Sequence, residues 1–329
     1  MSLIVRNLTK HYGDKLVVDA LSFEMPKNGV YALLGTNGAG KTTSIRMILD
    51  MLSRDTGEVT WNGRPLSTDT CNVGYLAEER GLYPKYTLMD QLIYFASLRG
   101  VPRDEAKKRI RYWSGRLQVD EYLYPTKPAR RRSLLGGSGL KGAPAASVPG
   151  KSMKADQLSK GNQQKIQLMT TLISEPALII LDEPLSGLDP VNTDLFKSII
   201  REEIEKGKYI IMSSHQMSTV EEFCTEITIL DRSHTILQGN LNEIKKSYGR
   251  VNLRLKVERD VSDLIARSGA HIESEKEYEY AIKVSDETQA NALLKLLIEA
   301  GITIVAFDLR EPSLHEIFVE KVGRTDAQN

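Results

Sequence analysis

The glycine-rich loop at residues 35–42 constrains the fold of this chain more than any other feature of the sequence. It reads GTNGAGKT and fits the pattern G-x-x-x-x-G-K-[ST]. It lies between the strand-like run GVYALL and a segment of helical period from Thr42 to Leu52. Glycines let the backbone curl so that several N–H groups face one anion, and the helix N-terminus adds the positive end of its dipole. A chance glycine turn is the alternative, but the flanking strand and helix favour a phosphate-binding site.

Within this loop, two side chains are expected to carry chemistry. Lys41 is expected to reach the β- and γ-phosphates of a nucleotide, and the Thr42 hydroxyl is expected to ligate Mg²⁺. A second apolar run, ALIIL at 177–181, ends directly in Asp182 and Glu183. Desolvating two carboxylates is costly unless a cation or partner is present, although solvated acids at a strand end are the simpler reading of this motif alone. Asp182 suits Mg²⁺ binding through water, and Glu183 suits polarising a water that attacks the γ-phosphate.

Composition limits the possible classes of protein. The chain has 329 residues, of which 41% are apolar, a length that favours two globular domains. Lys and Arg (44) nearly balance Asp and Glu (43), so no strong field points to nucleic acid or an anionic membrane as the main partner. The chain has only two cysteines, Cys71 and Cys224, and they are too few and too far apart in sequence to suggest a disulfide framework or a metal cluster. This fits a reducing compartment. No apolar stretch approaches the roughly 20 residues needed to span a bilayer, so we expect a cytoplasmic protein that reaches membranes only by docking.

The order of strand-like and helical runs predicts two domains. Residues 1–240 alternate strands with helices, which favours an α/β domain with a parallel sheet, and a helical subdomain is expected at about 85–175. Residues 241–329 form the second domain, where the pattern is β-α-β-β-α-β-α and indicates a small ferredoxin-like α+β unit. The absence of an internal repeat implies one nucleotide site in the chain.

One segment inside the helical subdomain has a different composition. Residues 124–151 are rich in Pro, Gly, Ser and Ala, show no sustained period, and carry six cations and no acid. We interpret this segment as a disordered insertion, since such a sequence cannot bury enough apolar surface to fold. A lineage-specific loop, a regulatory segment that binds an anionic partner and an artefact of the reading frame are the alternatives.

The motif LSKGN at 158–162, which precedes a helical run, brings these observations together. With it, the sequence resembles the ABC ATPases, whose usual motif at this place is LSGGQ; the variant keeps the serine and the second glycine. The resemblance implies a P-loop NTPase fold, with a mixed-sheet core, a helical subdomain and ATP hydrolysis. It also implies that Ser159 and Gly161 contact the γ-phosphate bound to the opposite subunit. Alone, the motif could equally be a helix cap.

Further family motifs follow in the expected order. Asp189 in SGLD resembles the loop that crosses the dimer interface, His215 after a strand ending in two serines resembles the histidine that contacts the γ-phosphate, and Tyr12 resembles the aromatic that stacks on adenine. The resemblance thus implies catalytic roles for Lys41, Glu183 and His215. The nucleotide-binding residues implied by it are Tyr12, Gly35, Asn37, Gly38, Gly40, Lys41, Thr42, Thr43, Ser159, Gly161 and Asp189.

One position departs from the family pattern. Family members usually carry a glutamine that senses the metal, whereas GYLAEERGLYP places Glu78 there. A glutamate still offers an oxygen to Mg²⁺, so the expected metal site consists of Thr42, Glu78 and Asp182. The added charge is expected to alter the coupling to a membrane subunit.

The functional expectation follows from the resemblance. EERGLYP at 78–84 and EPSLHEIF at 311–318 resemble the ATP-binding subunits of bacterial sodium-efflux and drug-resistance exporters. This implies ATP and Mg²⁺, a homodimer or a heterodimer with a related ATPase, separate permease subunits, and a place on the inner face of the cell membrane. The alternatives are a soluble ABC ATPase acting in translation or DNA maintenance, and a regulator that binds ATP without hydrolysing it. The sequence has neither a second ATPase domain nor a long coiled coil to support a soluble ABC ATPase of translation or DNA maintenance. No nucleic acid partner is therefore expected.

Overall fold

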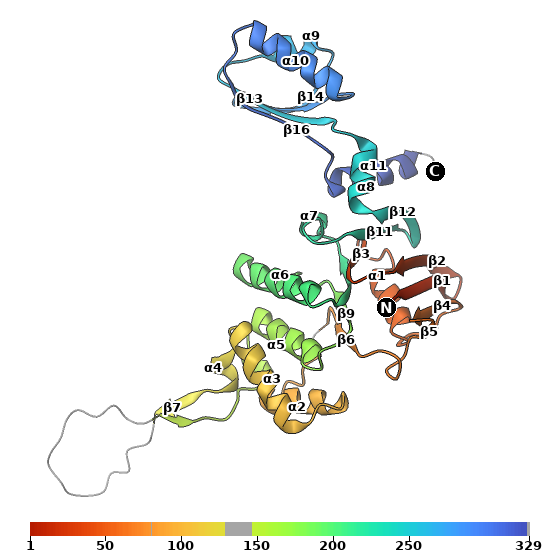
Figure 1. Ribbon diagram of the computed structural model, residues 1–329, viewed down its shortest axis with the longest axis vertical. Coiled ribbons are helices and arrows are strands. Elements are labelled where there is room, and N and C mark those ends of the chain that lie inside the picture. Colours follow the sequence, from red (N-terminus) through yellow and green to blue (C-terminus); the bar gives the residue numbers. More distant parts are fainter. Residues whose placement is uncertain (80, 129–146, 328–329) are drawn as a thin grey trace, which may run out of the picture. The chain divides into compact units, whose positions relative to one another are not determined.

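The computed structural model describes residues 1–79, 81–128 and 147–327 (Figure 1). The chain divides into two compact units. The first comprises Met1–Val30 and Lys41–Ser214, and the second comprises Tyr31–Gly40 and His215–Asn329. This division differs from the expected boundary between residues 240 and 241, which stays a prediction. None of the described helices is long and apolar enough to cross a lipid bilayer.

The first unit opens with an antiparallel sheet of strand order β2-β1-β4-β5. Its strands are β1 (Leu3–Tyr12), β2 (Lys15–Met25), β4 (Thr56–Trp61) and β5 (Arg64–Pro65). Helix α1 (Lys41–Ile48) ends before the expected Leu52, because Asp50 has a φ of 56° and takes the backbone out of the helical region. Helix α1 is therefore shorter than the helical period of the sequence predicts.

A second group of strands in this unit is parallel. β6 (Val73–Leu76) and β10 (Tyr209–Ser214) both pair with β9 (Leu178–Asp182). β9 and β10 are buried at every position, which explains their near-continuous apolar sequence. Because the strands are parallel, their carboxyl ends meet at one edge, where Ser213 is in register with Asp182.

The expected helical subdomain lies in the same unit. It contains α2 (Leu88–Leu98), α3 (Arg103–Arg116), α4 (Asp120–Leu123) and α5 (Lys160–Leu172), and α6 (Pro190–Glu205) follows β9. The segment from Leu88 to Arg116 forms two helices. Gly100, with a φ of 74°, and Pro102, which has no N–H donor, separate them.

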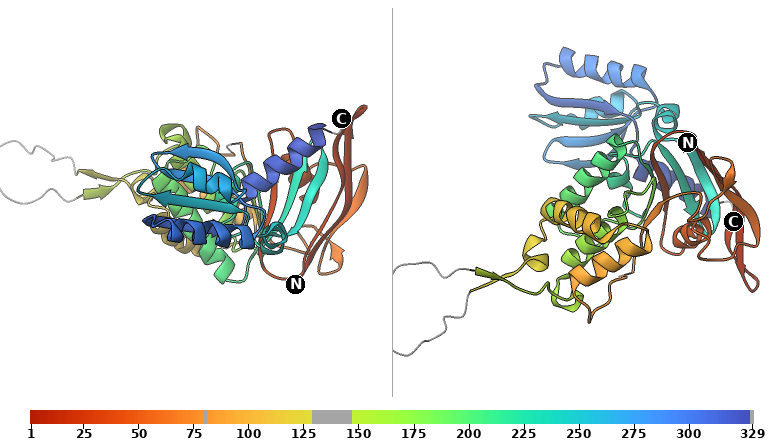
Figure 2. Two further views of the ribbon diagram at one scale, coloured as in Figure 1. Left: turned by 90° about the horizontal axis from the view of Figure 1, so that it is seen from above. Right: turned by 60° about the horizontal axis from the view of Figure 1, so that its bottom comes forward.

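The segment predicted as a disordered insertion has regular structure at its ends. β7 (Thr126–Pro128) and β8 (Ser147–Pro149) form an antiparallel pair in which Pro128 is opposite Ser147. Figure 2 shows this hairpin projecting from the helical part of the first unit. The prediction is therefore wrong for these six residues, because their backbone groups pair with one another. Residues 129–146 lie outside the described part of the chain.

The second unit contains most of the strand that leads into the glycine-rich loop. β3 (Gly29–Gly35) pairs in parallel with β11 (Glu226–Asp231), and β11 pairs antiparallel with β12 (His234–Asn240). The sheet core is mixed, as expected. The hairpin of β11 and β12 was not predicted, because its turn uses Arg232 and Ser233, both at positive φ, in place of the usual Asn-Gly.

The C-terminal part of this unit is an α+β fold with the predicted order of elements. Its antiparallel sheet has strand order β14-β15-β13-β16. The elements are β13 (Asn252–Val257), α9 (Ser262–Arg267), β14 (His271–Lys276), β15 (Glu279–Lys283), α10 (Glu287–Glu299) and β16 (Ile304–Arg310). Figures 1 and 2 show α10 along one face of the sheet, over a core that includes Leu255, Tyr280 and Leu293. Three further helices are α7 (Met217–Val220), α8 (Leu241–Tyr248) and α11 (Leu314–Ala327).

Candidate nucleotide-binding site

Asp182 and Glu183, at the carboxyl end of β9, form the centre of the candidate site. Both carboxylates are buried. Asp182 Oδ1 accepts hydrogen bonds from the Ser213 hydroxyl at 2.5 Å and from the Thr42 hydroxyl at 3.2 Å. The backbone N–H of Glu183 donates to Ser213 Oγ at 2.9 Å. Three sequence-distant segments are thus joined around one carboxylate, and Thr42 and Asp182 are brought together as predicted.

Lys41 also reaches this cluster. Its Nζ lies 3.4 Å from Glu183 Oε1, and the two side chains are only 6% and 7% exposed. Glu183 has a φ of 49°, in the left-handed region that non-glycine residues rarely adopt. Such backbone strain is common at functional sites. The Ser213 bond to the Glu183 amide helps to hold the backbone in this conformation.

The electrostatics of Asp182 fit a cation. Burial raises the pKa of Asp182, and its hydrogen bonds to Ser213 and Thr42 oppose that shift only in part. Asp182 Oδ2 is buried and has no hydrogen-bond partner among the described residues. A buried carboxylate oxygen without a donor is costly, and one or two carboxylates beside phosphate and water are the usual ligands of Mg²⁺. These residues therefore fit the expected magnesium ion.

The glycine-rich loop requires its glycines for steric reasons. Gly35 has a φ of 150°, and a Cβ there would lie 2.3 Å from the Leu230 carbonyl oxygen. Gly38 and Gly40 also have positive φ, at 82° and 107°. Asn37 and Gly38 are exposed, whereas Gly40 is buried at the start of α1. Thr43 is half-buried in the first turn of that helix.

The residues expected to act across a dimer lie at two helix starts in the first unit. Ser159 caps α5, and its hydroxyl oxygen accepts a hydrogen bond from the backbone N–H of Asn162 at 3.4 Å. Asp189 caps α6 and accepts a hydrogen bond from the backbone N–H of Asn192 at 2.9 Å. This bond lowers the pKa of Asp189. A Cβ on Gly161 would lie 3.4 Å from Asn192 Nδ2, so the two helix starts are close together.

Tyr12, the expected adenine-stacking residue, is 53% exposed at the end of β1. Asp55 holds the preceding residues. Its carboxylate accepts hydrogen bonds from the His11 amide at 2.6 Å and from Lys10 Nζ at 3.2 Å, and it lies 3.0 Å from His11 Nδ1. The His11 amide is the largest cause of the lowered pKa of Asp55. Sequence reasoning missed Asp55, because nothing local connects it with β1.

Two further predicted residues are exposed and lie in different units. Glu78 belongs to the first unit and follows β6, whereas His215 belongs to the second and directly follows the last residue of β10. Their roles stay predictions. Ser213 was the other residue that sequence reasoning missed as part of the site. The pair of serines that ends the apolar run YIIMSS was its only signal.

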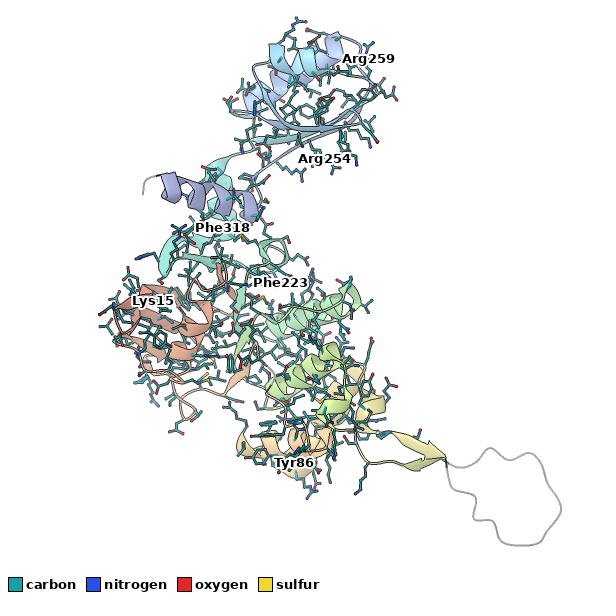
Figure 3. All side chains as sticks on the ribbon, turned by 180° about the vertical axis from the view of Figure 1, so that it is seen from behind. Lys15, Tyr86, Phe223, Arg254, Arg259 and Phe318 are labelled. Carbon is teal, nitrogen blue, oxygen red and sulfur yellow. The ribbon has the colours of Figure 1, made fainter. Side chains whose placement is uncertain are left out.

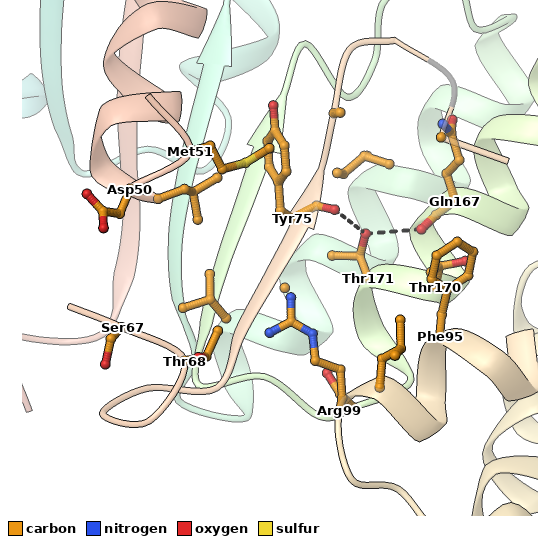
Figure 4. Close-up of a pocket in the computed structure, with 18 of the residues that line it drawn as sticks. Asp50, Met51, Ser67, Thr68, Tyr75, Phe95, Arg99, Gln167, Thr170 and Thr171 are labelled. Atoms are coloured by element: carbon orange, nitrogen blue, oxygen red, sulfur yellow. Dashed lines mark hydrogen bonds between the residues drawn. The ribbon is translucent and has the colours of Figure 1, made fainter. Parts of the chain in front are cut away.

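A cavity of about 730 Å³ lies in the first unit beside β6. Its wall includes Met51, Tyr75, Phe95, Arg99 and Gln167, which come from α1, β6, α2 and α5 and their adjoining loops (Figure 4). The Thr171 hydroxyl donates to the carbonyl oxygens of Tyr75 and Gln167, which ties β6 to α5 along this wall. The cavity thus lies between strand β6 and the helical subdomain.

Comparison with known proteins places this geometry in a family. The ABC transporter family matches residues 18–186, and the family described as "ATP-binding protein DrrA1-3-like, C-terminal domain" matches residues 239–322. An ABC transporter ATP-binding protein of Bacillus subtilis, YhaQ, is 38% identical over 98% of both chains. The linearmycin resistance ATP-binding protein LnrL of Bacillus subtilis is 28% identical over 98% of this chain and 99% of its own.

Solved structures support the same assignment. The ATP-binding subunit of an ABC transporter aligns with a TM-score of 0.62 at 25% identity and covers 75% of this chain and 93% of its own. A second solved structure, an ATP-binding cassette of an ABC transporter in its ADP conformation, aligns with a TM-score of 0.58 at 18% identity. It covers 75% of this chain and 94% of its own, and it supports the fold. The chain therefore belongs to the ABC transporter ATP-binding proteins, a family of ATPases, and is the ATP-binding subunit of such a transporter.

Proposed function

We propose that this chain drives an exporter, that two ATPase subunits close around two ATP molecules, and that closure moves separate permease subunits. The cluster of Lys41, Thr42, Asp182, Glu183 and Ser213 is the observation that carries the proposal. It gathers a cation for phosphate, oxygen ligands for a metal and a buried carboxylate for water at one sheet edge. A protein that only binds a nucleotide does not need a phosphate-binding cation, metal ligands and a carboxylate for water together.

In this proposal, Lys41 and the loop amides bind the β- and γ-phosphates, and Thr42, Glu78 and Asp182 would hold Mg²⁺. A bound Mg²⁺ supplies neutralisation of charge on the phosphate oxygens. Triphosphate gives Lys41 a new anionic partner, which releases Glu183 to polarise water. The water oxygen then bonds to the γ-phosphorus as the bond to the ADP oxygen breaks, and the water gives up one proton, which Glu183 accepts.

The dimer completes the site. Ser159, Gly161 and the start of α5 contact the γ-phosphate held by the other subunit, and Asp189 links the two sites. His215 contacts the γ-phosphate, and Tyr12 stacks on adenine. The exposed helix cap at Ser159 supports this role, because a hydroxyl at a helix N-terminus suits an anion. The C-terminal α+β fold serves dimerisation or regulation.

The cavity beside β6 is the proposed docking site for a helix of the permease. Its place between β6 and the helical subdomain lets movement of the segment after Leu76, which carries Glu78, reach that helix. The relatives named for linearmycin resistance and for Nod factor export in Rhizobium meliloti support export as the direction. We propose that the chain lies on the cytoplasmic face of the membrane through this permease.

A Glu183→Gln variant tests the catalytic proposal. It keeps the shape of the buried side chain while removing the charge, so we expect an ATP-bound dimer on size-exclusion chromatography and hydrolysis lowered by about a hundredfold or more. Equal slow hydrolysis by wild type and variant contradicts the role of Glu183 and favours an ATP-binding regulator. Purification from membranes separates the exporter from a soluble ATPase. An exporter subunit is expected to co-purify with a membrane protein that spans the bilayer several times, whereas a soluble ATPase is expected to co-purify with RNA or DNA.

A further inference from the structure

A second, smaller hollow lies on the helical subdomain and has an unusual lining. It measures about 350 Å³ and is lined by Tyr83, Tyr86, Asp90, Gln91 and Tyr94, residues that we call the tyrosine hollow. Tyr83, Tyr86 and Tyr94 are 49%, 63% and 50% exposed. Figure 3 shows Tyr86 at the surface of this region. Three aromatic rings around one depression leave considerable apolar surface in water, which is typical of an interaction site.

The hollow is held in shape by Gln91, which is only 3% exposed. Its Oε1 accepts a hydrogen bond from the Tyr83 amide at 2.7 Å, and its Nε2 donates to the carbonyl oxygens of Tyr83 and Tyr86 at 2.9 and 3.1 Å. A buried amide thus fixes the loop at both tyrosines. The Tyr83 ring also stacks on Phe95 with centroids 6.0 Å apart, and it meets the Tyr86 ring edge-on at 6.0 Å.

The chemistry of the lining selects a cation. Aromatic faces carry negative partial charge and attract ammonium and guanidinium groups. Asp90 adds a carboxylate at the first turn of α2, where the Thr87 hydroxyl donates to its Oδ2. The described residues that line the hollow include no lysine or arginine. Among the described lining residues, a basic side chain therefore finds aromatic rings and one opposite charge.

The tyrosine hollow adjoins the proposed permease-docking cavity. Phe95 lines that larger cavity and stacks on Tyr83, and Leu82 of the cavity wall immediately precedes Tyr83. We propose that the tyrosine hollow receives an arginine or lysine side chain from the permease segment that docks in the cavity beside β6. This inference rests on the proposed function and adds the chemistry by which the chain recognises its partner. Tethering to a docked helix supplies a high local concentration of the cation, which an open site on its own does not.

Substitutions in the full-length chain test this contact against the membrane subunit that co-purifies with it. The double variant Tyr86→Leu/Tyr94→Leu keeps apolar bulk and removes two rings. We expect its affinity for the purified permease in detergent to fall about tenfold, whereas Tyr86→Phe/Tyr94→Phe binds like wild type. Asp90→Asn is expected to weaken binding about two- to fivefold and to reduce its dependence on salt. Tyr112→Leu is the matched control, because Tyr112 is an exposed tyrosine on α3 outside the hollow.

Two further measurements locate the contact. A photo-reactive phenylalanine analogue in place of Tyr86 is expected to cross-link to a permease peptide that contains a lysine or arginine. The affinity of every variant for Mg-ATP, measured without the permease, is expected to equal that of wild type, because none of these residues belongs to the nucleotide site.

The outcomes separate this inference from the proposed function. A wild-type chain that binds no permease contradicts the proposed function itself. If wild type binds and the double leucine variant binds equally well, only the cation contact is wrong. Equal loss in the phenylalanine variants also overturns it, because a hydroxyl then makes the contact. Binding of tetramethylammonium to the hollow without any effect of the leucine variants on permease affinity assigns the site to a free cation instead.

Discussion

Ser213 donates a 2.5 Å hydrogen bond to Asp182, and the same hydroxyl oxygen accepts the backbone N–H of Glu183. One buried side chain on β10 thereby fixes both acids at the end of β9. The relationship follows from the register of the two parallel strands, in which Ser213 is opposite Asp182. A hydroxyl suits this position because it both donates and accepts, which a methyl, amine or carboxylate cannot do in the same way.

Replacing Ser213 by alanine is expected to disturb both acids. The change leaves the Asp182 carboxylate and the Glu183 amide each without one partner, which costs about 1–3 kcal/mol in the free energy of unfolding. The attacking water loses its alignment as well, so ATP hydrolysis is expected to fall about ten- to a hundredfold. Urea unfolding and steady-state ATPase assays measure the two effects. Ser213→Thr, which keeps the hydroxyl, is the control; full activity in the alanine variant contradicts the positioning role.

Replacing Asp182 by asparagine is expected to separate stability from function. Burial raises the pKa of Asp182, so the folded state binds a proton more tightly than the unfolded state. This group therefore lowers the stability of the nucleotide-free chain as the pH rises through the window above the ordinary carboxyl pKa of 3.8. The neutral amide removes that cost. At pH 7 without nucleotide we expect a Tm no lower than that of wild type, together with ATPase activity reduced by at least about a hundredfold. A large drop in Tm contradicts this interpretation.

Asp55 is expected to set the affinity for the adenine end of ATP. Asp55→Ala removes the acceptor that holds Lys10 and His11, so Tyr12 loses its fixed position, and the KM for ATP is expected to rise about two- to tenfold with kcat unchanged. Inhibition by tripolyphosphate, which has no adenine, is expected to stay the same. A parallel loss of tripolyphosphate affinity indicates general damage to the fold instead.

The Asp55 contact also has a defined pH dependence. The hydrogen bond from the His11 amide lowers the pKa of Asp55 below its ordinary value of 3.8. The stabilisation is therefore fully present above pH 3.8 and is lost as the pH falls through the lower pKa of the folded state. Thermal unfolding of wild type and Asp55→Ala is expected to converge below that pKa. Curves that stay equally far apart at every pH contradict this account.

The hairpin of β7 and β8 is expected to tolerate shortening. Pro128 lies opposite Ser147, so an Asn-Gly turn in place of residues 129–146 can join the two strands directly. ATPase activity is expected to remain within about threefold of wild type, since loop length changes stability only slowly. Complete loss of activity in a folded variant, judged by circular dichroism, assigns an essential role to the removed residues.

The local parts of this protein could be predicted from neighbouring residues along the chain. The glycine loop before α1, the apolar strand ending in Asp182 and Glu183, and the β-α-β-β-α-β-α order near the C-terminus all rest on neighbouring residues, and the structure confirms these elements. The register of β9 and β10, which joins Ser213 to Asp182, and the contact of Asp55 with His11 depended on tertiary structure. Such contacts join segments whose distance along the chain gives no periodic signal, because only packing of the whole domain decides which strands and loops become neighbours.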